Sequence, residues 1–230
     1  MTRLAIIPAR GGSKRIPRKN VKEFCGKPMI AWSIEAALDS GCFDHIIVST
    51  DDPEIAAIAE EYGAEVPFTR PKELADDHTA TRPVINHAIE EASQLWGMPD
   101  YVCCIYATAP FMLAEDLKRA FTTLEESHAD FVFSAGRFAY PIQRGFRVDE
   151  AGRVERLWPE HRYTRSQDLE EAYHDAGQFY WGKTSAFLNL GDPMSEAGVA
   201  YVLPATRVHD IDTKEDWAVA ELLFRALNQR

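Results

Sequence analysis

Short apolar runs alternate with longer segments of helical period along most of this 230-residue chain. The runs RLAIIPA, HIIVST, YVCCIY and DFVFSA are typical of buried strands, and the segments that separate them carry apolar residues at helical spacing. Strands that alternate with helices favour a mostly parallel sheet with helices on both faces. The pattern therefore predicts an α/β fold, and ligands of such sheets bind beyond the carboxyl ends of the strands.

Capping residues predict where several helices begin and end. In DDPEIAAIAEEYG, Asp52 is placed to cap a helix that has Pro53 at its first position. The segment KPMIAWSIEAALDSG predicts a helix that Gly41 ends, and the last helix opens with a capping-box spacing from Asp212 to Glu215. The helix in KPMIAWSIEAALDSG and the last helix are together expected to turn eight side chains inward: Ile30, Ile34, Ala37, Leu38, Trp217, Ala220, Phe224 and Leu227.

The stretch from about Arg137 to Asp175 departs from the alternation of strands and helices. It is rich in aromatic residues and arginines and lacks a helical period. We interpret residues 137–175 as an insertion, a hairpin with extended arms. Because no repeat, low-complexity tract or long linker divides the chain, we expect one domain that spans residues 1–230.

The glycine-rich turn PARGGSKRIPRKN, residues 8–20, follows the first predicted strand directly and holds five basic residues. The whole chain carries a formal net charge of −11, which argues against general nucleic-acid binding and favours a local pocket for a small anion. Gly11 and Gly12 allow a tight turn, and backbone amides there, with Lys14 and Lys19, would form a nest for phosphate oxygens. The turn matches neither GxxxxGK[ST] nor GxGxxG, and the alternative is a solvated basic turn.

Two acidic residues near the last helix are candidates for binding a metal ion. Asp210 and Asp212 flank Ile211, so both carboxylates could point to one side of an extended segment. Mg²⁺ binds through one or two carboxylates plus substrate phosphates, which suits such a pair. Asp212 could equally cap the last helix, and the residues alone leave both interpretations open. Asp51 and Asp52 form a weaker pair, because a helix cap is a sufficient role for Asp52.

The cysteines and the apolar runs indicate the compartment. Cys103 and Cys104 lie inside an apolar run and are expected to be buried thiols, and none of the four cysteines belongs to a CxxC pair. The sequence has no recognisable signal peptide and no apolar run of the length of a membrane span. A cytoplasmic protein is the expectation.

The turn IIPARGGSKRIPRKN resembles the signature of the CMP-sialic acid synthetase family, cytidylyltransferases that activate eight-carbon and nine-carbon keto-sugar acids. Further matches follow in the order of the family, namely RPKELADDHT, YATAP, DAGQFYWG and DIDTKEDW, and they span nearly the whole chain. Within the family, GGSKRIPRKN, CGKPMIAWSIEAA and HDAGQFYWG are most similar to the pseudaminic acid branch. The resemblance implies a Rossmann-like fold of the nucleotide-diphospho-sugar transferase type, in which the insertion pairs two subunits into a homodimer.

The resemblance also implies a reaction and a nucleotide site. The anomeric hydroxyl of a nonulosonic acid, pseudaminic acid in this branch, would attack the α-phosphorus of CTP and release pyrophosphate, with Mg²⁺ held by Asp210 and Asp212. Arg10, Lys14 and Lys19 would be the catalytic cations that contact the phosphates. The remaining nucleotide-binding residues would be Gly11, Gly12, Ser13, Asn20, Arg70, Thr79 and Thr81. Arg70 would face cytosine, since a donor suits the acceptor edge formed by O2 and N3.

The segment QFYW resembles the lining of the sugar pocket in this family. The sugar-binding residues would be Tyr106, Gln178, Phe179 and Tyr180, although alternation along a strand sends some of these side chains into the core. Tyr106, in YATAP, stands where enzymes for sialic acid commonly have a glutamine, which argues against sialic acid itself. Arginines of the insertion are candidates for the sugar carboxylate or for the partner subunit: Arg144, Arg162 and Arg165.

Other functions remain compatible with parts of the pattern. The nearest alternative is a cytidylyltransferase for legionaminic, sialic or ketodeoxyoctonic acid. A metal-dependent glycosyltransferase would also use a DxD pattern such as DID, but the basic turn argues against that class. A catalytically silent nucleotide-binding protein is disfavoured by the intact set of charged residues.

Overall fold

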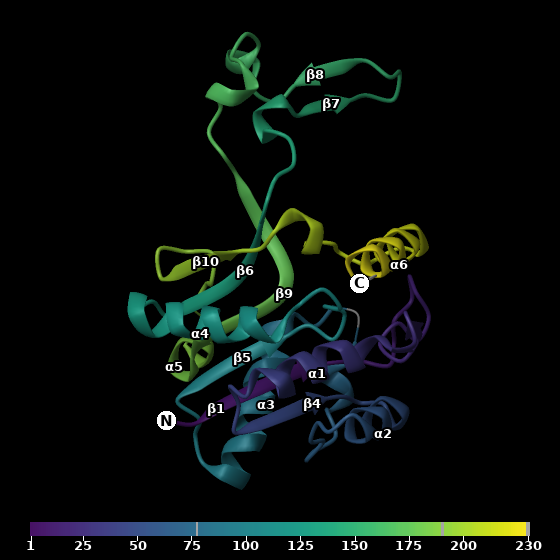
Figure 1. Cartoon of the computed structure of the whole chain (residues 1–230), viewed down its shortest axis with the longest axis vertical. Helices are drawn as coiled ribbons and strands as arrows, with labels where there is room; N and C mark the ends of the chain where they lie inside the picture. Colours follow the sequence, from purple (N-terminus) through teal and green to yellow (C-terminus); the bar gives the residue numbers. More distant parts are fainter. Residues whose placement is uncertain (77, 190, 229–230) are drawn as a thin grey trace.

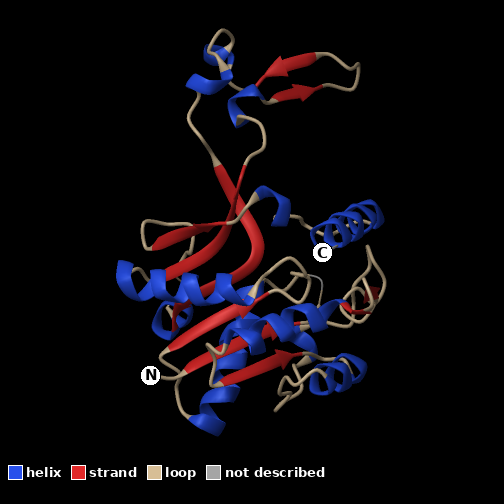
Figure 2. Ribbon diagram, viewed as in Figure 1, coloured by secondary structure: helices blue, strands red, loops and turns tan. Residues whose placement is uncertain are grey.

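The four apolar runs predicted as strands join two further strands in a six-stranded sheet in the computed structural model, which describes residues 1–76, 78–189 and 191–228. Its strand order is β10-β6-β9-β5-β1-β4 (Figure 2). The strands are β1 (Arg3–Pro8), β4 (His45–Ser49), β5 (Tyr101–Ile105), β6 (Phe131–Arg137), β9 (Tyr173–Lys183) and β10 (Gly198–Val202). Only β9 is antiparallel to its neighbours, β5 and β6, among the pairings of these strands. The predicted mostly parallel sheet is confirmed.

Helices cover both faces of the sheet, which gives a three-layer α/β fold (Figure 1). Buried side chains of α1 (Met29–Ser40), α2 (Pro53–Glu61) and α4 (Ala114–Ser127) pack with Ile7 and Cys103 on one face. Those of α3 (Thr81–Trp96) and α5 (Thr184–Leu188) pack with Ile6 and Cys104 on the other. Both cysteines are thus buried, as predicted. Within the described residues, no helix combines the length and the apolar character that crossing a membrane would require.

The caps explain where the helices begin, and one predicted cap is wrong. Asp52 caps α2 as predicted, accepting hydrogen bonds from the amides of Glu54 and Ile55 at 2.9 and 3.1 Å. At the last helix, α6 (Lys214–Asn228), the capping box joins Thr213 and Asp216 rather than Asp212 and Glu215. The Asp216 carboxylate accepts from the Thr213 amide at 2.7 Å, and the Asp216 amide donates to the Thr213 hydroxyl at 3.1 Å. The side chain of Asp212 therefore has another role.

Two of the eight side chains predicted to face inward are exposed. Leu38 and Leu227 are 42% and 44% exposed, whereas the other six are buried. Leu38 lies at the edge of the apolar stripe of α1, next to Ala37, and extends along Gly63 after α2. Leu227 lies in the last turn of α6, beyond the residues that this helix packs inward.

A separate hydrophobic cluster connects α6 to the glycine-rich turn. Trp217 and Phe224 of α6 pack edge-on against Phe24, with ring centroids 5.3 and 5.4 Å apart. Phe24 belongs to a small hairpin of β2 (Glu23–Phe24) and β3 (Lys27–Pro28), which the sequence did not reveal. Ile16 of the glycine-rich turn is fully buried in the same cluster. The last helix thus supports the turn that carries the predicted phosphate ligands.

The insertion extends away from the sheet at the end of β6 and the start of β9 (Figure 1). These two strands remain paired up to Arg137 and Tyr173, so the segment that leaves the sheet runs from 138 to 172. Beyond them, β7 (Phe146–Val148) and β8 (Val154–Arg156) form the predicted antiparallel hairpin. The insertion also contains short 3-10 turns: η2 (Ile142–Arg144), η3 (Pro159–His161) and η4 (Ser166–Asp168).

Candidate functional site

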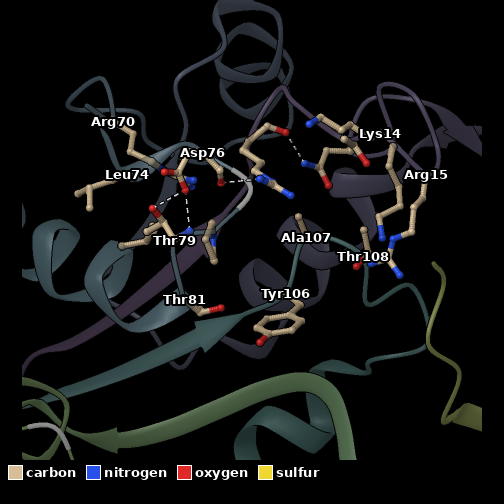
Figure 3. A pocket seen from close by; sticks show the side chains of 16 residues that line it. Lys14, Arg15, Arg70, Leu74, Asp76, Thr79, Thr81, Tyr106, Ala107 and Thr108 are labelled. Atoms are coloured by element: carbon tan, nitrogen blue, oxygen red, sulfur yellow. Dashed lines mark hydrogen bonds between the residues drawn. The ribbon is translucent and has the colours of Figure 1, made fainter. Parts of the chain in front are cut away.

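A cleft of about 630 Å³ lies beyond the carboxyl ends of β1 and β5, where the predicted fold places a ligand (Figure 3). Lys14 and Arg15 line one wall, Arg70 and Thr79 line the opposite wall, and Tyr106 lies between them. The cleft brings together these predicted site residues: Arg10, Ser13, Lys14, Lys19, Asn20, Arg70, Thr79, Thr81 and Tyr106. Residues far apart in the sequence therefore meet around one space.

Hydrogen bonds fix the basic wall of the cleft. Asn20 is buried, and its side-chain amide donates to the Arg10 carbonyl at 3.0 Å, which joins the two ends of the glycine-rich turn. Lys19 donates to the carbonyl of Ile211 at 2.7 Å and pairs with Asp212 at 3.3 Å. Arg10 reaches across to the carbonyl of Asp76 at 2.5 Å. Arg10 and Lys19 are thus held in place by neutral and acidic groups of two other segments of the chain.

The carboxylate of Asp52 leaves room only for a glycine at position 11. A Cβ at this position would lie 2.4 Å from Oδ2 of Asp52, a distance that side chains do not tolerate. The Gly11 amide donates to Asp51 at 3.1 Å, so it has a carboxylate partner instead of the phosphate oxygen expected from the sequence. At Gly12, by contrast, a Cβ would meet nothing within 4 Å. Neither Gly11 nor Gly12 is among the described residues that line the cleft.

Asp212 and Asp210 lie at the end of the basic wall. Asp212 forms an ion pair with Arg15 at 2.6 Å, in addition to its contact with Lys19. Partial burial and the nearby Asp212 raise the pKa of Asp210. The described residues hold no group of three or more histidine, cysteine or acidic side chains arranged for a metal. Two carboxylates beside the predicted phosphate-binding cations are nevertheless a donor set that suits Mg²⁺, which takes its other ligands from phosphate and water.

Arg70 is buried at the wall opposite the glycine-rich turn. Its Nε donates to the hydroxyl of Ser49 at 3.1 Å, and its Nη2 donates to the carbonyl of the same residue. Burial lowers the pKa of Arg70 to about 10, with a contribution from Arg10 and opposition from Asp51. The guanidinium therefore stays charged at neutral pH and has a fixed orientation, as a base-recognising donor requires.

The segment before α3 is organised by Asp76, which is not among the predicted site residues. Its carboxylate accepts from the amides of His78 and Thr79 at 2.9 and 2.6 Å and from the Thr79 hydroxyl at 2.7 Å. The bond from the His78 amide, two residues after Asp76, is that of an Asx turn, for which an aspartate is a signal in the sequence. Residue 77 of this motif lies outside the described residues.

The predicted sugar residues divide between two environments. Tyr106 and Tyr180 line a second cavity of about 220 Å³, which shares Thr81 and Tyr106 with the cleft. Their ring centroids are 5.5 Å apart, and the Tyr180 hydroxyl donates to Asp175 in the same cavity. Burial raises the pKa of both tyrosines, so their hydroxyls stay protonated at neutral pH.

Gln178 and Phe179 are turned away from this cavity. Gln178 is buried, and its side-chain amide donates to the carbonyl of Arg207 in the short turn η5 (Ala205–Arg207). Phe179 is fully buried in the core, on the face of the sheet opposite Tyr180. The Phe179 side chain is therefore not available to a sugar, and that of Gln178 supports the segment that leads to Asp210.

The insertion arginines are engaged within the insertion itself. Arg144 donates to the carbonyl of Thr164 at 2.5 Å, and Arg165 pairs with Asp168 at 2.6 Å. The Arg162 guanidinium lies 5.2 Å from the centroid of the Tyr163 ring. None of the three lines the cleft described above.

Comparison with solved structures identifies the fold. The chain superposes over its whole length, with a TM-score of 0.68 at 18% identity, on CMP:2-keto-3-deoxy-manno-octonic acid synthetase in complex with CTP, of which it covers 99%. The similarity shows the α/β fold of nucleotidyltransferases, as predicted.

Sequence comparison specifies the family. The family model described as cytidylyltransferase matches residues 4–195. The chain is 46% identical to the pseudaminic acid cytidylyltransferase of Campylobacter jejuni, over 98% of this chain and 97% of the relative. It is 33% identical to the CMP-N,N'-diacetyllegionaminic acid synthase of Legionella pneumophila, over 98% and 97%. The chain belongs to the cytidylyltransferase family, which confirms the resemblance recognised in its motifs.

Proposed function

We propose that this protein transfers CMP from CTP to the anomeric hydroxyl of a nonulosonic acid, most specifically pseudaminic acid, and releases pyrophosphate. The observation that carries the proposal is one cleft of about 630 Å³ whose lining includes Lys14, Lys19 and Arg70. The similarity to the pseudaminic acid enzyme supports the choice of sugar. The reaction would take place in the cytoplasm, where CTP is available.

The residues of the cleft suit nucleotidyl transfer. Attack on the α-phosphorus depends mainly on positioning and on neutralisation of charge on the phosphates. Arg10 offers a planar fork for two phosphate oxygens, whereas Lys14 and Lys19 act as point charges. Arg70, fixed by Ser49, donates to the acceptor edge of cytosine. Thr79 and Thr81, which follow on the same wall, would contact the base and the ribose.

We propose that Asp210 and Asp212 hold Mg²⁺. Bound there with the triphosphate, the ion would supply positive charge against the leaving pyrophosphate. Asp212 would exchange its ion pairs with Arg15 and Lys19 for this role, and both cations would become available to phosphate oxygens. The phosphate groups would thus replace the carboxylate as the partner of the basic wall.

We propose that the sugar acid binds where the cleft meets the second cavity. Thr81 and Tyr106 belong to both spaces, so an acceptor placed there would lie beside the nucleotide. Protonated tyrosine hydroxyls and the Asp175 carboxylate supply both donors and acceptors for hydroxyl and amide groups of a sugar. Legionaminic acid is the second candidate substrate, supported by the 33% identical relative.

The function is tested by incubating the protein with CTP, Mg²⁺ and, in separate reactions, pseudaminic, legionaminic, sialic and ketodeoxyoctonic acid. Release of pyrophosphate with formation of the CMP-sugar is expected to be fastest with pseudaminic acid. Pyrophosphate formation without any sugar acid, measured in parallel, gives the background of CTP hydrolysis. If pyrophosphate were released no faster with any of the four sugar acids than without one, the proposal would be contradicted. A preference for another sugar would reassign the substrate.

We propose that the insertion pairs two copies of this chain. The hairpin exposes Phe146, Val148 and Val154 by 58, 60 and 70%, on a segment that extends beyond the sheet. An apolar surface of this kind is stabilised when a second copy covers it. An isologous contact between two hairpins would give a closed dimer.

Replacing Val154 by aspartate is expected to convert the dimer to a monomer, because burying an unpaired carboxylate in an apolar contact is strongly unfavourable. Sedimentation velocity or light scattering measures the mass. Val219→Asp is the matched control, since Val219 is also an exposed valine, 47% exposed, but lies on α6. A wild-type mass of one chain, or a Val154→Asp mass equal to a dimeric wild type, would contradict the proposal.

A further inference from the structure

Arg18 has an unusual backbone conformation at the end of the glycine-rich turn. Its φ of 56° lies in the left-handed region, which non-glycine residues adopt at a cost. The Arg18 carbonyl accepts from the amides of Val21 and Lys22 at 3.1 and 2.9 Å. The conformation at Arg18 therefore sets the direction in which Lys19 and Asn20 leave the turn.

The Arg18 side chain is held by two carboxylates and does not line the cleft. Its Nη2 donates to Asp52 at 3.1 Å, its Nη1 donates to the other oxygen of Asp52, and Nη2 also donates to Glu54. The hydrogen bonds from Arg18 lower the pKa of Asp52 to about 2, with help from the α2 amides and against the effect of burial. The described residues that line the cleft include Arg10 and Arg15 but not Arg18.

Asp52 is itself rigidly placed. It caps α2, and its own amide donates to the hydroxyl of Thr50 at 3.1 Å. Gly11 lies so close to this carboxylate that no side chain fits between them. The neighbouring Asp51 takes the Gly11 amide at 3.1 Å. Two consecutive carboxylates thus contact both the first and the last residue of the segment 11–18.

We propose that Arg18 is a positioning residue: its ion pair with Asp52, together with the hydrogen bond from the Gly11 amide to Asp51, locks the glycine-rich turn into its phosphate-binding shape before the nucleotide arrives. The lock fixes Gly11 and Arg18 against the start of α2, and Lys14 and Lys19 are carried by the backbone that it holds. Preformed binding groups raise affinity, because less conformational entropy is lost when the ligand binds. This inference rests on the proposed function, because it takes the bound anion to be the triphosphate of CTP.

The first test is made without any ligand. Hydrogen exchange of the amides of Val21 and Lys22, which bond to the Arg18 carbonyl, is expected to accelerate at least about tenfold in Arg18→Gln, since opening of the turn becomes easier. Arg119→Gln is the control, because it removes an arginine from an exposed ion pair with Glu115 on α4. Unchanged exchange in Arg18→Gln would overturn the lock, whatever the protein is found to bind.

The second test measures CTP binding by calorimetry in the absence of a sugar acid. Arg18→Gln and Asp52→Asn are each expected to raise the Kd for CTP roughly tenfold, the effect of losing a hydrogen bond between charged groups. Asparagine caps a helix as well as aspartate does, so Asp52→Asn keeps α2 and removes only the charge. The double variant is expected to bind like the single ones, because both changes break the same link.

Two further variants distinguish the loss of the Arg18–Asp52 ion pair from effects of the charge or of the backbone strain at residue 18. Arg18→Lys, which keeps the charge, is expected to restore part of the affinity. Arg18→Gly relieves the backbone strain without restoring the link, and is expected to bind as weakly as Arg18→Gln. Wild-type affinity in Arg18→Gly or in Arg18→Gln would overturn the inference while leaving the proposed function intact. Failure of the wild-type protein to bind CTP would instead contradict the proposed function, and the exchange experiment would still decide on the lock.

Discussion

Asp212→Asn is expected to lower Mg²⁺-dependent turnover by at least about a hundredfold, because a metal ligand supports several kcal/mol of charge stabilisation and each 1.4 kcal/mol is a factor of ten. The substitution keeps the size of the side chain and removes the charge that Arg15 and Lys19 contact. Turnover is measured over a series of Mg²⁺ concentrations, and Mg²⁺ binding to the CTP complex is measured separately by titration calorimetry.

Glu215→Gln is the matched control for this experiment. Glu215 is exposed in the first turn of α6, and its neutralisation changes the net charge by the same amount. The control is expected to turn over like the wild type. If Asp212 served only to position Lys19, its loss would raise the KM for CTP and leave the response to Mg²⁺ unchanged. That outcome would contradict the proposed metal site.

Arg70→Gln is expected to weaken CTP binding by roughly ten- to a hundredfold, the effect of losing charged hydrogen bonds worth about 1.5–3 kcal/mol. It is also expected to reduce the preference for CTP over UTP. Uracil carries a donor at N3 where cytosine carries an acceptor, so only cytosine accepts from a guanidinium there. The measurement compares kcat/KM for the two nucleotides in the wild type and the variant.

Because Arg70 is buried against Ser49, its replacement can also affect folding. Arg70→Lys is therefore assayed beside it, since lysine keeps the positive charge but cannot present the planar fork. We expect the lysine variant to retain phosphate binding and to lose most of the discrimination against UTP. An unchanged ratio of CTP to UTP in both variants, with folded protein by circular dichroism, would exclude a base-reading role.

The elements of the fold that follow local rules could be predicted from the sequence. Asp52 and Pro53 begin α2 as predicted, and the apolar runs become the central strands. The hairpin β2–β3 was missed because its strands have only two residues each. The cap of α6 was displaced by one residue, since Asp212 and Thr213 both match a capping pattern and only the structure shows which is used.

The site could be predicted as a set of residues but not as a set of contacts. Lys19 and Asp212 are 193 residues apart, and Arg18 and Asp52 are 34 apart, so no spacing rule connects them. Gly11 was singled out for its closeness to a ligand, whereas the structure shows that it makes room for Asp52. Gln178 and Phe179 were predicted from a motif. Alternation along β9 turns Phe179 to the face opposite Tyr180, and the Gln178 side chain bonds to the carbonyl of Arg207, so Tyr180 alone of these three lines the second cavity.

Because Ile16, Phe24, Trp217 and Phe224 form a cluster of their own, we expect the protein to lose activity on heating before its sheet unfolds. These side chains lie outside the two clusters that hold the six-stranded sheet, and Ile16 belongs to the glycine-rich turn. Segments packed through a small separate cluster can open at a lower free energy than the whole molecule. Detachment of α6 would therefore release the predicted phosphate ligands and the acidic pair together, while the sheet stays intact. The heat resistance of the enzyme would then depend on its last helix rather than on its main core.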